Sequence, residues 1–167
     1  SFFIGPATVA LMVSLYDNIN TLKKNYAAIL VGILIGSFVS MIVTIILAKV
    51  LKVDELMMMT LLPESVTTPI AVGLAEEYGG IAPLAAIAVI IRGIIGIIIA
   101  PIIIRVFKIN DPVAQGIGLG TAAHALGTAE AREMGDIQGA MSGLSIAVAG
   151  LMTVILMPLM VLISNAI

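Results

Sequence analysis

Residues 27–48, AAILVGILIGSFVSMIVTIILA, run for 22 positions without a charged side chain. At about 1.5 Å per residue, a helix of this length reaches across the roughly 30 Å hydrocarbon core of a bilayer. Ile81–Ile104 and Ile137–Ile163 are two further long apolar stretches, and the first of them contains one charge, Arg92. The whole chain of 167 residues is 60% hydrophobic and 11% charged, whereas soluble domains carry about 25% charged residues. These patterns predict an all-α integral membrane protein that crosses the bilayer several times.

The composition also excludes several classes of function. A net charge of −2 provides no basic surface for nucleic acid. The chain has no Cys and one His, and its carboxylates are scattered among the loops, so we expect no metal and no cofactor. The motif GAMSG at 139–143 does not have the G-x-S-x-G spacing of a serine nucleophile, so we expect no enzyme.

Charges and turn residues delimit three less regular segments, Ser1–Tyr16, Leu56–Ala75 and Pro112–Met134. The first has 16 residues, which is too short for a span. Because the chain begins at Ser1 inside an apolar run, we expect residues 1–167 to be a single transmembrane domain that lacks its N-terminal part.

Leu56–Ala75 contains two prolines, Pro63 and Pro69, which flank a polar stretch. Two prolines six residues apart are incompatible with an unbroken helix. The pattern predicts a helix, an unwound polar stretch and a second helix. Thr67 or Thr68 would cap the second helix, with Pro69 at its first position.

Pro112–Met134 is the second irregular segment. It contains Gly116, Gly118, Gly120 and Gly127, and Gly is the residue that destabilises a helix interior most after Pro. His124 and Thr128 lie near its middle. We predict a second broken helix here, with Thr128 as the cap of its second half.

The two irregular segments are parts of a weak internal repeat with an offset of 57 to 59 residues. Each is followed by an acidic helix end, a glycine, a span and a proline, Pro101 or Pro158. If both segments are re-entrant, the loop cations divide five against two, which obeys the positive-inside rule, and the repeats are inverted. If both cross fully, the division is three against four and gives no orientation.

The unwound stretches are the predicted functional site. Lipid cannot satisfy free backbone groups, so such stretches line a polar cavity, and the N-termini of half-helices favour an anion there. Paired irregular segments point to the binding site of a transporter, although they can also be structural kinks. The predicted substrate-binding residues are Ser65, Thr67, Thr68, Arg92, His124, Gly127 and Thr128.

Arg92 lies in the middle of a span, so its charge should be paired inside the bundle. Glu64 and Glu130 flank the unwound stretches and are the candidate partners for an ion pair or for coupling. Both a structural ion pair and a counter-ion for the substrate remain open. His124 could hydrogen-bond a carboxylate or shuttle a proton, or it could be a satisfied polar residue between helices.

The sequence resembles the LrgB/CidB family of membrane proteins nearly from end to end. The resemblance rests on GPATVAL at 5–11, LPESVTTPIA at 62–71, GI at 80–81, GTAAHALGTA at 120–129 and GAMSGL at 139–144. The strings S-V-T-T-P-I-A and G-T-A-x-H-x-x-G-T-A are together specific.

This resemblance implies a location in the cell (cytoplasmic) membrane and a small membrane partner of the LrgA/CidA type. Bacterial members were first described as holin-like or antiholin-like regulators of murein hydrolase activity and cell lysis. The plastid relative exchanges glycolate and glycerate, and some bacterial pairs move pyruvate. We therefore expect a transporter or facilitator of small monocarboxylates that forms a homo-oligomer, such as a dimer. The alternative is a holin- or antiholin-like regulator of lysis.

Three charged positions depart from the family pattern. Many bacterial relatives have Lys at the position of Glu64, Arg at that of Glu130, and Thr or another uncharged residue at that of Arg92. Our hypothesis is that Arg92 supplies the positive charge of the site and is held by one glutamate. The rival interpretation is a cationic or neutral substrate.

Overall fold

The structure, a computed structural model, describes residues 16–166, with the backbone alone for Leu22. The described residues form helices and no strand, which confirms the predicted all-α class. The helices are α2 (Ile19–Val50), α3 (Glu55–Leu61), α4 (Thr68–Glu77), α5 (Ala82–Val106), α6 (Pro112–Met134) and α7 (Asp136–Ala166). The predicted segment Ser1–Tyr16 lies outside the described residues except for Tyr16.

Three described stretches are long and apolar enough to cross a membrane, and they coincide with the predicted spans. They are Lys23–Val50, Ala82–Val106 and Asp136–Ala166. α5 illustrates the expected lipid-facing surface, because isoleucines such as Ile91, Ile98 and Ile102 are more than half exposed. In lipid such side chains are already in an apolar solvent, so their exposure does not destabilise the fold.

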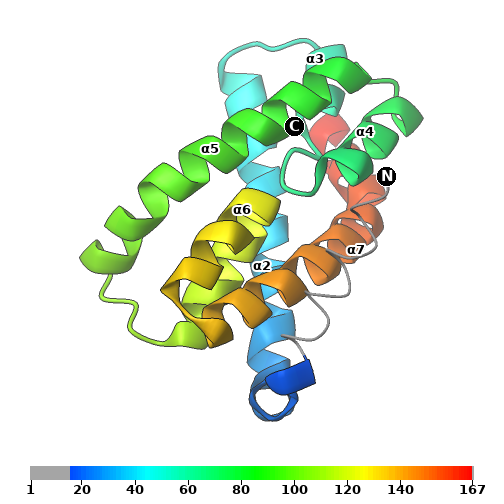
Figure 1. Ribbon diagram of the computed structural model, residues 1–167. Coiled ribbons are helices and arrows are strands. Elements are labelled where there is room, and N and C mark those ends of the chain that lie inside the picture. Colours follow the sequence, from blue (N-terminus) through cyan, green and yellow to red (C-terminus); the bar gives the residue numbers. More distant parts are fainter. Residues whose placement is uncertain (1–15, 167) are drawn as a thin grey trace, which may run out of the picture.

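The core lies between α2 and α7 (Figure 1). Near one end of these helices, Met41 and Ile45 of α2 pack with Met157 and Met160 of α7, and all four side chains are fully buried. α3 and α4 add to this cluster. The unbranched methionine side chain adapts to the irregular gaps between crossing helices.

α3 and α4 form a helical hairpin. Asp54 caps α3 by accepting a hydrogen bond of 2.7 Å from the backbone N–H of Met57. After α4 the chain returns to α3, where the N–H of Ile81 donates to Thr60 Oγ1 at 2.8 Å. Gly80 lies so close to Thr60 that a Cβ atom at this position would be 2.9 Å from the Thr60 backbone nitrogen.

The turn of this hairpin covers residues 62–67. Of the two threonines predicted to cap α4, Thr67 occupies the cap position, but its side chain makes no capping hydrogen bond. α4 begins at Thr68, so Pro69 is its second residue rather than its first. Proline is tolerated there because the first turn of a helix leaves its N–H groups without intrahelical partners.

α6 is also folded back on itself. His124 has a φ of 48° and a ψ of −122°, outside helical geometry, so α6 consists of two helical parts. Gly127 lies against the backbone carbonyl of Leu119, whereas eight residues would be about 12 Å apart along a straight helix. The predicted cap at Thr128 is wrong: the chain reverses four residues earlier, and Thr128 is inside the second helical part.

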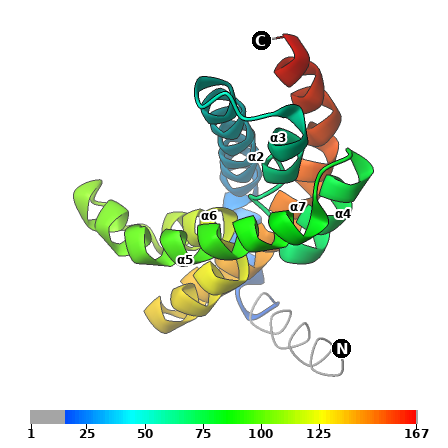
Figure 2. The ribbon, with the colours of Figure 1, turned by 90° about the horizontal axis from the view of Figure 1, so that it is seen from above.

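The two hairpins approach each other from opposite ends of α5. The α3–α4 hairpin precedes the first residue of α5, and the α6 hairpin follows its last residue (Figures 1 and 2). The start of α2, the end of α5 and the base of the α6 hairpin point toward the same end of the molecule (Figure 1). The re-entrant alternative requires both segments to fold back in this way, but re-entry into a membrane and the internal repeat stay predictions.

Candidate functional site

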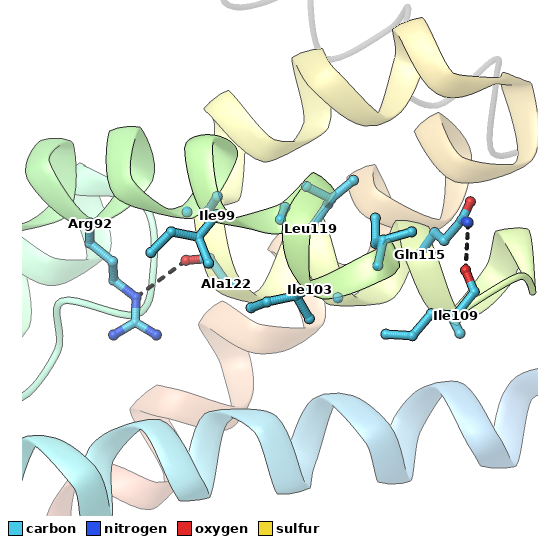
Figure 3. Close-up of a pocket in the computed structure, with 13 residues that line it drawn as sticks. Arg92, Ile99, Ile103, Ile109, Gln115, Leu119 and Ala122 are labelled. Atoms are coloured by element: carbon cyan, nitrogen blue, oxygen red, sulfur yellow. Dashed lines mark hydrogen bonds between the residues drawn. The ribbon is translucent and has the colours of Figure 1, made fainter. Parts of the chain in front are cut away.

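The tips of the two hairpins meet beside Arg92, the eleventh of the 25 residues of α5. Arg92 Nη1 forms an ion pair with Glu64 Oε1 of the first tip at 3.0 Å. Arg92 Nε donates to the backbone carbonyl of Ala122, next to the second tip, at 3.3 Å (Figure 3). The predicted pairing of Arg92 with Glu64 is therefore present, and one guanidinium connects both hairpins.

Glu64 has a second partner that the sequence analysis missed. Thr44 Oγ1 of α2 lies 3.3 Å from the same carboxylate oxygen and 3.1 Å from the backbone carbonyl of Ser40. The only signal in the sequence was a hydroxyl side chain in a span that also contains Ser37 and Ser40. That signal could not show which of the other helices Thr44 would face.

His124 and Ser65 form the contact between the two tips. His124 is 3% exposed, and its side chain lies beside the backbone of Ser65. Within residues 16–166, His124 Nε2 and Ser65 Oγ are buried and have no hydrogen-bond partner. An unsatisfied buried polar atom destabilises a fold by about 1–3 kcal/mol, and of these two residues His124 lines a cavity.

A cavity of about 200 Å³ adjoins His124. Thr67, Thr68 and Pro69 of the first hairpin line one side of it, and residues 123–126 of the second hairpin line another. Val89, Ile90 and Gly93 of α5 complete the wall. The N-terminal end of α4 lies at this cavity, and a helix N-terminus carries a partial positive charge. Since water occupies about 30 Å³ per molecule, the cavity has room for a small organic ion.

Gly127, Thr128 and Glu130 lie elsewhere. Gly127 packs within the α6 hairpin, and the Thr128 hydroxyl is 2.7 Å from Ser142 Oγ of α7 in a buried contact. Glu130 lines a separate cavity of about 250 Å³ together with Arg105, near the C-terminal end of α5. Of the two glutamates that we considered as partners for Arg92, the structure thus selects Glu64.

The arrangement separates the predicted residues into two groups. Glu64, Ser65, Thr67, Thr68, Arg92 and His124 converge where the hairpin tips meet, and Gly127, Thr128 and Glu130 do not. Within residues 16–166, no group of three His, Cys, Asp or Glu side chains is placed to hold a metal ion. The functional groups at this site are a paired cation, an imidazole and several hydroxyls.

Three spans with lipid-compatible surfaces, joined through two helical hairpins, define a multi-pass helical membrane protein. The chain belongs to the LrgB-like family, whose model matches residues 1–163. Similar proteins include the antiholin-like protein LrgB of Bacillus cereus (strain B4264) and that of Bacillus anthracis (strain CDC 684 / NRRL 3495). Each is 39% identical over 159 residues, which cover 95% of this chain and 69% of the relative. No solved structure matches the chain.

Proposed function

We propose that this protein is a transporter or facilitator of small monocarboxylates such as pyruvate, glycolate or glycerate. The observation that carries the proposal is the meeting of two hairpin tips around Arg92 and His124, in the middle of the transmembrane helix α5. A charged residue at this depth is costly in a membrane protein and marks substrate pathways.

The electrostatics support an anionic substrate. An arginine side chain has five N–H donors, and the ion pair and the carbonyl contact use only Nη1 and Nε. A second carboxylate could share the guanidinium with Glu64 or replace Glu64. The free Nε2 of His124 and the free Oγ of Ser65 would then provide the polar contacts that fix the orientation of the substrate.

The second candidate function is regulation of cell lysis by a holin- or antiholin-like mechanism. It is favoured by the names of the Bacillus relatives, which are described as antiholin-like. A regulator of this kind assembles in the membrane but has no need for an enclosed polar site. In either case we propose the cytoplasmic membrane as the location, a homo-oligomer such as a dimer, and a small membrane partner of the LrgA/CidA type.

Flux measurements distinguish the two functions. The purified protein would be reconstituted into vesicles, and uptake of radiolabelled pyruvate and glycolate would be compared with leakage of labelled sucrose. A carboxylate transporter gives saturable uptake that sucrose does not share, and His124→Ala reduces it strongly. A leak that does not discriminate between solutes, or no flux at all, would favour the regulator.

The role of Arg92 is tested by Arg92→Thr, which places an uncharged residue at the position. We expect this variant to lose anion uptake while it retains its helical content and its elution volume in gel filtration. Ile98→Thr is the matched control, because Ile98 is on the same helix and is 64% exposed. Undiminished anion uptake by the Arg92 variant would refute the hypothesis that Arg92 supplies the positive charge of the site.

A further inference from the structure

A second and larger cavity, of about 400 Å³, lies between α5 and the first half of α6. Its walls include Gly96, Ile99 and Ile103 from α5 and Gly118 and Ala122 from α6, and Arg92 is at one end (Figure 3). The cavity is twice the size of the one beside His124. It is too large for the two- or three-carbon acids considered above.

The cavity is elongated and apolar along most of its length. From Arg92 to Ile103 the wall follows α5 for 11 residues, or about 16 Å. At the far end, Gln115 donates to the carbonyl of Ile109 at 2.7 Å and accepts from Gln138 at 3.0 Å, so its amide group is satisfied within the fold. Arg92 is therefore the polar group in this wall with capacity for a ligand.

The guanidinium of Arg92 is open toward a ligand on one edge. Its hydrogen bonds to Glu64 and Ala122 use Nη1 and Nε, and no acceptor within residues 16–166 is bound to Nη2. The Arg92 side chain remains 25% exposed. The cavity is also accessible from the side, since Gly118 and Ala122 are exposed and a Cβ atom at Gly118 would meet nothing within 4 Å.

We propose that this cavity binds a single-chain acyl carboxylate of medium to long chain length. The carboxylate contacts the Nη2 edge of Arg92, and the hydrocarbon tail lies along Ile99 and Ile103. The proposal goes beyond the small-substrate site, with which it shares Arg92, and Ala123 lines both cavities.

The bilayer determines which part of such a ligand gives selectivity. A tail that leaves lipid for an apolar cavity gains almost nothing, because lipid tails are as apolar as leucine. Preferential binding therefore depends on the charge-assisted hydrogen bonds between the carboxylate and Arg92. Removal of the guanidinium should weaken this binding at least tenfold, even though the apolar walls are unchanged.

The depth of Arg92 favours a free acid over a phospholipid. Arg92 is 10 residues from the first residue of α5 and 14 from the last, or about 15 Å and 21 Å along the helix. Phospholipid headgroups lie outside the hydrocarbon core, which is roughly 30 Å thick. A carboxylate can take up a proton and reach this depth as a neutral carboxylic acid, whereas a phosphate diester stays charged and cannot.

Tryptophan fluorescence provides a test, because the sequence contains no Trp. Ile99→Trp places a reporter in the cavity, and Ile98→Trp places its matched control on the lipid-facing side of the same helix. The proteins would be reconstituted in phosphatidylcholine vesicles and titrated with 11-bromoundecanoic acid, whose bromine quenches Trp on contact. Ile103→Trp serves as a second reporter if the first variant does not fold.

We expect saturable quenching of the cavity reporter and only linear, unsaturated quenching of the control. Adding Arg92→Gln should raise the half-saturation concentration at least tenfold. Gly118→Leu should remove the saturable component by filling the cavity, whereas Gly73→Leu should not, because Gly73 is outside the cavity and also has no atom within 4 Å of its Cβ position.

Three results would overturn the proposal. They are identical linear quenching of both reporters, saturable quenching whose half-saturation concentration is unchanged by Arg92→Gln, and equal saturation by phosphatidylglycerol with brominated chains. The outcome is independent of the small-substrate proposal, because saturable acyl binding without pyruvate uptake would refute only the transporter. Pyruvate uptake without saturable acyl binding would refute only this inference.

Discussion

Two glycines of α6, two residues apart, should respond in opposite ways to the same added methyl group. A Cβ atom at Gly118 would meet no atom within 4 Å. At Gly120 it would lie 2.8 Å from both Ser142 Cα and Ser145 Cβ of α7, and against the carbonyl oxygen of Ser142. Favourable carbon–carbon contacts lie at about 3.5–4.0 Å, so Gly120→Ala overlaps the α7 backbone by about 1 Å.

The magnitude follows from the comparison of the two variants. Both replacements gain helix propensity, which is worth about 0.8–1.0 kcal/mol in a helix interior. Gly118→Ala should therefore raise the free energy of unfolding by an amount of this order. Gly120→Ala carries the same gain but forces α6 and α7 apart, and overpacking of this kind destabilises by about 1–3 kcal/mol. The difference between the variants isolates this steric term.

The measurement is unfolding by sodium dodecyl sulfate in dodecyl maltoside micelles, followed by circular dichroism. Both variants and the parent protein would be compared at the same detergent ratio, with Gly73→Ala as a further control at an open site. We expect the order of stability to be Gly118→Ala, parent, Gly120→Ala. Equal stability of the two variants would refute the close approach of α6 to α7 on which the reasoning depends.

Three further predictions concern the hydrogen bonds and the backbone at the hairpins. Thr128→Val leaves the Ser142 hydroxyl without its 2.7 Å partner and should lower the unfolding free energy by about 1–3 kcal/mol, with partial recovery in the double variant with Ser142→Ala. A double-mutant cycle with Glu64→Gln and Arg92→Gln should give a coupling energy of about 1–3 kcal/mol, which lies between the values for exposed and for buried ion pairs. A coupling energy near zero would show that the 3.0 Å ion pair does not form. The His124→Gly variant should be about 1 kcal/mol more stable than the His124→Ala variant in the same micelles, because glycine adopts a φ of 48° with a ψ of −122° without strain. The reverse order of stability would contradict this backbone geometry.

The spans could be predicted from the sequence because the bilayer requires only a minimum number of consecutive apolar residues. A helix of more than about 20 apolar residues satisfies its own backbone and is long enough to cross. The three predicted spans agree with α2, α5 and α7 within a few residues at most ends, and α2 begins eight residues earlier, at Ile19. The polar extension from Asn25 back to Ile19 continues the helix beyond the apolar stretch, which hydropathy does not detect.

The glycines of α6 show where sequence reasoning was incomplete. They were interpreted as a sign of weak helix, yet the backbone is non-helical only at His124. Gly116 and Gly120 are buried against α7, where a Cβ atom would meet backbone atoms of Gln138 and Ser142. Small residues at such positions allow close packing of helices in membranes. The sequence alone does not distinguish a glycine that weakens a helix from a glycine that allows two helices to pack closely.

The sequence by itself determined the membrane class, the three spans, the two proline- and glycine-marked interruptions, and the need to pair Arg92. Each of these follows from the solvent and from local backbone chemistry. Only the tertiary structure decided that both interrupted segments fold back, that Glu64 rather than Glu130 holds Arg92, and that Thr44 joins them. These choices depend on which side chains meet across different helices. Hydropathy and spacing act along a single chain segment, so they do not contain that information.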